Sequence, residues 1–149
     1  MAEALHLAKR EPEAKQAFAE FEKKSLLESI RKDNSSRELI FYYADYAQQP
    51  GKALEIAKQE YAWRHDVYTL DAYAWALHVN GNDNEARNQI NTALAVGIRD
   101  AKIFDHAGEI ALRLGDQAAA ERYLQMSASL HAAGSEQANL LLARIDKSR

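Results

Sequence analysis

Residues 68–77 read Tyr-Thr-Leu-Asp-Ala-Tyr-Ala-Trp-Ala-Leu, and residues 102–111, which begin 34 positions later, read Lys-Ile-Phe-Asp-His-Ala-Gly-Glu-Ile-Ala. In this alignment Leu70, Tyr73, Ala74 and Leu77 correspond to Phe104, Ala107, Gly108 and Ala111. The match continues downstream, where Gly81, Ala86, Ile90 and Ala93 correspond to Gly115, Ala120, Leu124 and Ser127. A period of this length indicates a chain built from one supersecondary unit used several times.

Helix start and stop signals show what the unit is. Asp66 is a candidate cap for a helix that runs to about Asn80, and Gly81 follows where a residue tolerant of positive φ is needed. Asn82 and Glu85 then have the spacing of a capping box for a second helix, which Gly97 closes. Each unit is therefore predicted to be a helix–turn–helix pair.

The same signals recur downstream and, less clearly, upstream. Asp100 and Asp116 are candidate caps in the next unit, with Gly115 and Gly134 as stops. Upstream, Ser35 and Glu38 form another possible capping box for a helix that runs to about Gln48. Pro50 suits the first turn of the next helix, which ends near Trp63. Pro12 opens the N-terminal helix, which follows a short helical piece at 2–9. We therefore expect a single domain, 1–149, comprising a truncated pair (1–33), a blurred pair (34–66), two clear pairs (67–100 and 101–133) and a capping helix (134–149) that Ser135 caps.

Composition agrees with a helical protein and excludes several other classes. Pro and Gly are scarce, at 2 and 6 of 149 residues, which argues against turn-rich β folds. The 19 Lys and Arg against 22 Asp and Glu supply no basic stripe for nucleic acid, and no apolar run reaches the roughly 20 residues of a membrane span. The absence of cysteine removes disulfides and thiolate chemistry and leaves the cell compartment open.

This pattern of small and large residues at a period of 34 resembles the tetratricopeptide repeat family, most clearly over residues 50–133. Its fold implies an all-α, right-handed superhelix in which small residues, such as Ala74 and Ala86, let helices approach closely. Two departures are visible. The closing proline is replaced by Ile98 and Ala132, and the register of residues 34–50 is ambiguous because Phe41 or Ala44 could occupy the small position.

The resemblance implies a concave groove lined by the first helix of each pair, and hence protein or peptide binding without chemistry. First-helix residues outside the packing positions form the expected groove: Tyr42, Asp45, Tyr46, Tyr68, Asp71, Trp75, His78, Val79, Lys102, Asp105, Glu109 and Arg113. Rings and carboxylates suit a peptide with an apolar anchor and basic residues. The competing interpretation is that Trp75 and Tyr42 only fill space between adjacent first helices.

Two other functions remain open. One is a self-associating structural module, because Leu5, Leu7, Phe18, Phe21, Leu26 and Leu27 present more apolar surface than one short helix covers, so the chain is either a piece of a longer array or a homodimer. The other is a metal-binding or enzymatic domain using His78, His106 and Glu109. We expect neither a metal nor a cofactor, because His106 and Glu109 are two ligands on one helix face where zinc needs three or four, and no second cluster or catalytic motif accompanies them.

We predict that the chain does not bind the acidic carboxylate tail that some tetratricopeptide domains take from chaperones. The clamp for that tail uses lysines, an arginine and asparagines, whereas this sequence has Trp75 and Glu109 where the first helices would present the asparagines. Titration with such a tail peptide should give no saturable signal, and micromolar binding would contradict the prediction.

Overall fold

The computed structural model describes residues 11–29, 36–130 and 136–147, and these form helices joined by short turns. The order is α2 (Glu11–Ser29), α3 (Arg37–Phe41), the π-helix η1 (Tyr42–Tyr46), α4 (Pro50–Tyr61), α5 (Val67–Val79), α6 (Asp83–Leu94), α7 (Ala101–Arg113), α8 (Gln117–Leu130) and α9 (Glu136–Lys147). No described residue lies in a strand, and the described part of the chain has no helix with the length and apolar character of a bilayer span. The expected helical piece at 2–9, the stop Gly134 and the cap Ser135 lie outside the described residues.

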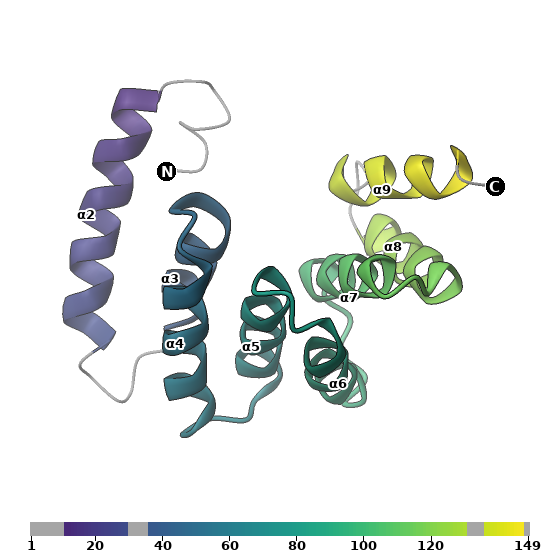
Figure 1. Ribbon diagram of the computed structural model, residues 1–149, viewed down its shortest axis with the longest axis horizontal. Helices are drawn as coiled ribbons and strands as arrows, with labels where there is room; N and C mark the ends of the chain where they lie inside the picture. Colours follow the sequence, from purple (N-terminus) through teal and green to yellow (C-terminus); the bar gives the residue numbers. More distant parts are fainter. Residues whose placement is uncertain (1–10, 30–35, 131–135, 148–149) are drawn as a thin grey trace.

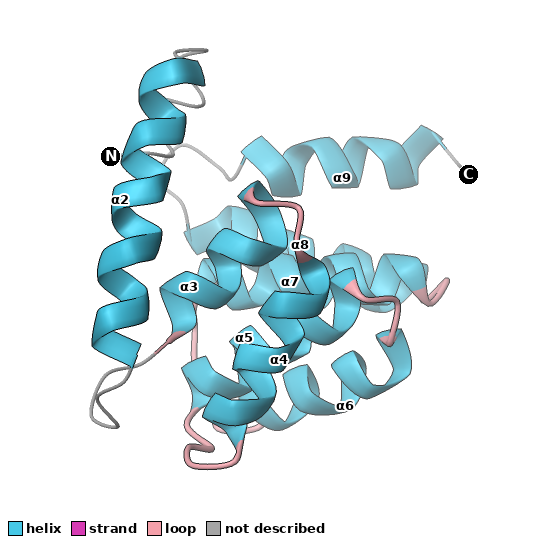
Figure 2. Ribbon diagram, turned by 60° about the vertical axis from the view of Figure 1, so that its left-hand side comes forward, coloured by secondary structure: helices cyan, strands magenta, loops and turns pink. Residues whose placement is uncertain are grey.

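The helices stack in chain order, as Figures 1 and 2 show from two directions. α5 packs on α6 and α7 on α8, and each second helix also contacts the first helix of the next pair. The first helices α3, α5 and α7 touch one another as well. The chain is therefore an all-α superhelix of helix pairs, as the repeat predicts.

The predicted helix boundaries of the clear pairs are confirmed within a residue or two. The side-chain oxygen of Asp66 accepts the amides of Tyr68 and Thr69, and Asp100 does the same for the amides two and three residues after it. Gly81, Gly97 and Gly115 all adopt positive φ, between 77 and 81°. These values lie in the left-handed region, where a side chain is strained, so glycine terminates the helices for the reason the sequence suggests.

One predicted cap is wrong. The Asn82 side chain makes no capping hydrogen bond, so the Asn82–Glu85 capping box does not form. The Glu85 carboxylate instead accepts the Tyr73 hydroxyl at 3.3 Å, which ties α6 to α5. The second expected box, Ser35–Glu38, stays a prediction, although Ser36, the residue before α3, makes no side-chain cap. Ser35 itself is outside the described residues.

The blurred region contains a feature that the sequence pattern did not predict. In place of one helix to Gln48, α3 passes into η1, where the Ala47 amide donates to the Tyr42 carbonyl at 2.9 Å, and the chain then turns at Gln48 with φ of 51°. A π-turn encloses one more residue than an α-turn. Side chains before and after it cannot follow a single 3.6-residue period, which is why the register of residues 34–50 was ambiguous.

The two ends of the stack are covered by different means. At the C-terminal end Leu141 and Ile145 of α9 are buried against Leu124 of α8, as expected of a capping helix. At the other end the Phe18 ring lies 5.3 Å from that of Tyr42, and Phe21 lies 5.7 Å from the same ring, measured between centroids. Both phenylalanines thus contact their own chain. The side chains of Leu5, Leu7, Leu26 and Leu27 are outside the described part of the structure, so self-association through this face stays a prediction.

The two candidate caps at Asp66 and Asn82 provide a matched test of helix termination. Asp66→Ala should lower the free energy of unfolding by about 1–2 kcal/mol, because two helix amides lose their acceptor, whereas Asn82→Ala should change it by less than about 0.5 kcal/mol. Urea unfolding at neutral pH measures both. Equal losses in the two variants would contradict the assignment.

The pKa of Asp66 determines how the stability lost in Asp66→Ala depends on pH. Burial alone would raise the pKa of Asp66, but hydrogen bonds from the Thr69 hydroxyl and from the Thr69 and Tyr68 amides together hold that pKa below its ordinary value. A lowered pKa in the folded state stabilises the fold above roughly pH 4 and loses this effect as the pH falls. The gap in stability between the wild type and Asp66→Ala should therefore narrow in acid.

Candidate functional site

The three first helices bring the expected groove residues onto one surface of the stack. α3 with η1, α5 and α7 follow one another in contact, so residues three and four apart on each helix form a continuous face. The face is unevenly exposed. Tyr68, Asp45, Lys102 and Arg113 are exposed, whereas Asp71, Trp75 and His78 are buried.

Trp75 of α5 is held between its two neighbouring first helices. Its indole Nε1 donates to Oδ1 of Asp45 in η1 at 2.7 Å, and its ring stacks on the His106 ring of α7 with centroids 4.2 Å apart and planes 18° from parallel. Only 9% of Trp75 is exposed. The side chain fills space between first helices, which agrees with the competing interpretation of this residue.

Asp71 lies one turn earlier on α5 and is fully buried. Its Oδ1 is 2.7 Å from Nδ1 of His106, and its Oδ2 is 4.0 Å from Nη2 of Arg37. The Arg37 guanidinium also lies over the Tyr68 ring, with Cζ 4.8 Å from the centroid. A buried carboxylate is tolerated only with such partners, so Asp71 joins three helices and exposes no atom to a ligand.

The remaining predicted residues divide between the interior and the surface. Nδ1 of His78 is 2.5 Å from Oδ1 of Asp83, so His78 is bound within its own helix pair. Tyr42 and Tyr46 are half-buried against Phe18 of α2, with Phe18–Tyr46 centroids 4.9 Å apart. Asp105 and Glu109 are half-buried on α7, and Val79 ends α5 in the same state.

Three residues at this surface were missed by the groove prediction: Arg37, Phe41 and His106. Phe41 is buried, its ring 5.4 Å from that of His106, and Nζ of Lys102 lies 3.8 Å from the Phe41 centroid. The ambiguous register of residues 34–50 hid Arg37 and Phe41. His106 was considered only as a metal ligand, although it follows Lys102 by four residues and so shares that residue's helix face.

An open cavity of about 370 Å³ lies where α3 and α5 begin. Arg37, Glu38, Arg64, Asp66 and Tyr68 line it. Tyr68 is 43% exposed and is the large ring that this surface presents to solvent. The candidate groove is therefore open at this cavity, beside the N-terminal ends of α3 and α5, while its centre is occupied by the Trp75–His106 stack.

Two chemical alternatives, a metal site and a catalytic histidine, can be compared with the geometry of this surface. Among the described residues no group of three His, Asp or Glu side chains is arranged to hold a metal ion. His106 is 5% exposed and lies under the Trp75 ring, so a substrate has no access to its imidazole. The Nδ1 atom of His106 pairs with the carboxylate of Asp71.

Comparison with solved structures places this architecture. The Sgt2 TPR domain from Aspergillus fumigatus superposes with a TM-score of 0.64 at 15% identity, over 77% of this chain and 80% of that one. The fold is tetratricopeptide-like. The Yersinia enterocolitica type III secretion translocator chaperone SycD gives a TM-score of 0.60 at 19% identity, over 78% and 96% of the two chains. A type III secretion complex from Aeromonas hydrophila gives 0.55 at 17% identity, over 83% of each.

Sequence comparison adds no family assignment, since no family model and no curated protein matches the chain. At these low identities the structural neighbours establish the tetratricopeptide-like fold. They do not carry over a partner or a set of binding residues, which must be argued from this chain.

The burial of Asp71 predicts a structural effect on substitution. Asp71→Ala should lower the free energy of unfolding by about 1–3 kcal/mol, because the buried imidazole of His106 loses its hydrogen-bond partner. Arg113→Ala, on the exposed end of the same surface, should change it by less than about 0.5 kcal/mol. Urea denaturation of both variants checks this, and a loss no larger in Asp71→Ala than in Arg113→Ala would contradict it.

Proposed function

We propose that this chain is a non-enzymatic protein-binding scaffold and that a partner segment lies across the N-terminal ends of α3, α5 and α7. The observation that carries the proposal is the open cavity of about 370 Å³ beside Tyr68, on the helices that line the concave side of such superhelices. A cleft of this size receives one or two side chains, with an exposed ring to pack against.

The mixed charge of the cavity favours a particular kind of segment. Arg37 and Arg64 face Glu38 and Asp66 around it, so the lining has no net sign, and Tyr68 supplies the apolar contact. An apolar anchor in the partner therefore contributes more to the affinity than the net charge of the partner does. Basic residues flanking the anchor would meet Asp45 and Glu109 farther along the surface, although the burial of Asp71 makes this acidic character weaker than the sequence suggests.

The structural neighbours support a binding role of this type. SycD is named as a translocator chaperone, and the Aeromonas hydrophila structure is named as a type III secretion complex, so two neighbours of similar architecture are described by chaperoning or assembly rather than catalysis. The second alternative, an enzyme or metal site on His78, His106 and Glu109, is disfavoured because both histidines are buried and paired with carboxylates.

The proposal is tested by site-specific photo-crosslinking. A benzophenone amino acid in place of Tyr68 should capture a partner in cells of the source organism, because this side chain projects from the proposed surface. Trp63 is the matched control, since it is an aromatic residue 72% exposed and does not line the cavity. Substitution of Trp75 is unsuitable, because loss of a buried Trp costs about 3–5 kcal/mol of stability.

The expected result is a discrete adduct from position 68 and none from position 63. Adducts of equal yield at both positions would indicate non-specific capture and contradict the groove. Absence of any adduct at position 68, with the variant folded and expressed, would contradict the binding function itself.

A further inference from the structure

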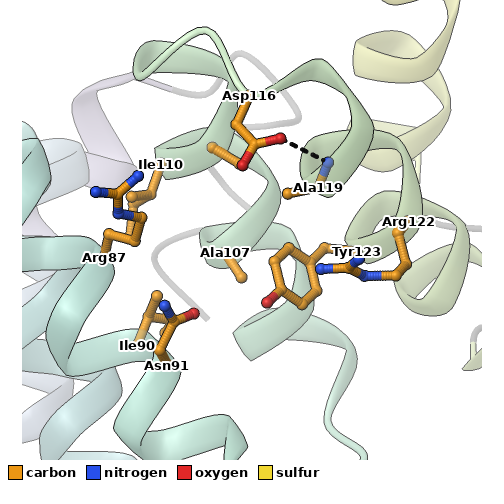
Figure 3. A pocket seen from close by; sticks show the side chains of 10 residues that line it. Arg87, Ile90, Asn91, Ala107, Ile110, Asp116, Ala119, Arg122 and Tyr123 are labelled. Carbon is orange, nitrogen blue, oxygen red and sulfur yellow. Dashed lines mark hydrogen bonds between the residues drawn. The ribbon is translucent and has the colours of Figure 1, made fainter.

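A second pocket lies on the other side of α7, between the second helices α6 and α8 (Figure 3). Its volume is about 140 Å³. From α7 it is lined by Ala107, Ile110 and Ala111, whereas the candidate groove uses Lys102, His106 and Arg113 on a different face of the same helix. The two sites are therefore separate, and a ligand in one leaves the other open.

The repeat explains why there is space here. Positions 107 and 111 correspond, 34 residues earlier, to Tyr73 and Leu77. Both of these large side chains are buried, and Tyr73 lies between α4 and α6: its ring is 4.8 Å from that of Tyr61 and its hydroxyl donates to Glu85. In the next pair both positions are alanine, so the volume that a tyrosine ring takes between α4 and α6 is left open between α6 and α8.

The size of the pocket agrees with this comparison. An apolar cavity of about 150 Å³ in a protein interior accepts a benzene molecule. The apolar part of the lining consists of Ile90, Ile110, alanines and the ring of Tyr123, so a phenyl ring is a matched occupant. The position of Glu85, which binds the Tyr73 hydroxyl, corresponds to Ala119, and this favours a ring without a hydroxyl group.

The rim of the pocket is cationic. Arg87 and Arg122 line it from opposite helices together with the amide of Asn91 (Figure 3). Within the described residues Arg87 and Asn91 have no side-chain partner, and Arg122 has a ring contact with Tyr123 but no carboxylate. The lining carboxylate, Asp116, already accepts the Ala119 amide at 3.0 Å. Two guanidinium groups thus line the pocket, together with one carboxylate that already accepts a hydrogen bond. This excess of positive charge favours an anionic ligand.

We propose that this pocket binds the C-terminal residue of a partner polypeptide that ends in phenylalanine. The phenyl ring occupies the volume that Tyr73 fills in the preceding pair, and the terminal carboxylate accepts hydrogen bonds from Arg87 and Arg122. A free carboxylate of a few atoms would gain little affinity from so small a pocket. Arg87, Asn91 and Arg122 at the rim are exposed, so the chain that precedes a terminal residue can leave the pocket over α6 and α8, and this favours a polypeptide terminus over a small aromatic acid.

The test uses a short peptide ending in Ala-Phe, with a free carboxylate or with a C-terminal amide. Titration into the ¹⁵N-labelled protein should shift the backbone amides of Ala107, Ala111 and Ala119 for the acid. The amide should bind at least about tenfold more weakly, because it lacks the charge that the two arginines recognise. N-acetylphenylalanine, titrated alone, should also bind more weakly than the peptide acid.

Matched variants locate the interaction. Arg87→Gln and Arg122→Gln should each weaken binding of the acid by about tenfold. Arg99→Gln makes the same charge change at an exposed position outside the pocket and should leave binding unchanged. Ala107→Phe should fill the pocket, abolish binding and raise the midpoint of thermal unfolding; if this variant does not fold, the arginine variants decide.

Three results would overturn the proposal. Equal affinity for the acid and the amide would exclude recognition of the carboxylate. Affinity of N-acetylphenylalanine equal to that of the peptide would make this a small-molecule site. Shifts confined to residues outside the pocket, or binding insensitive to both arginine substitutions, would place the peptide elsewhere.

Discussion

The close approach of α7 and α8 at Gly108 is the contact on which the C-terminal half of the stack depends. A Cβ added at Gly108 would lie 2.7 Å from Cγ of Leu124, closer than packed carbon atoms allow. Because glycine stands there, Leu124 lies directly against α7 and is fully buried. Its other side then contacts Leu141 and Ile145, so the position of the capping helix α9 follows from the absence of one side chain two helices earlier.

The same constraint explains how much of the fold could be predicted from sequence. Small residues at Ala74, Ala86 and Ala120 recur with the period of the repeat, and all three are fully buried. The spacing of these small residues and of the glycines at positive φ can be read directly from the repeat pattern in the sequence. The transition from α3 to η1 has no counterpart in the clear pairs, and Tyr42, the first residue of η1, packs against Phe18 of α2, a contact that the periodicity of residues 34–50 does not indicate.

The sequence could indicate which face of each helix a candidate site residue occupies, but it could not indicate whether that residue is buried or exposed. A helical period assigned Asp71, Trp75 and Lys102 to one groove, and in the structure each of the three has a partner on a neighbouring first helix. Whether each is exposed depends on neighbours from other helices. Lys102 is exposed, whereas Trp75 is covered by His106, and the Asp71 carboxylate is enclosed by His106 and Arg37. A pattern along one helix cannot report a partner that is 31 to 35 residues away.

Departures from the repeat are more informative about function than the repeat itself. The two clear pairs share the same helix arrangement. A large side chain at a position in one pair and a small side chain at the equivalent position in the other must therefore leave different volumes between the equivalent helices. Tyr73 closes that volume in the first clear pair, and Ala107 leaves it open in the second. The helix positions are set by the shared small residues, so this difference in filling does not require the backbone to move. Where the repeat matches, the chain builds a scaffold; where it fails, as at Ala107 and Ala111, the scaffold acquires a pocket of its own.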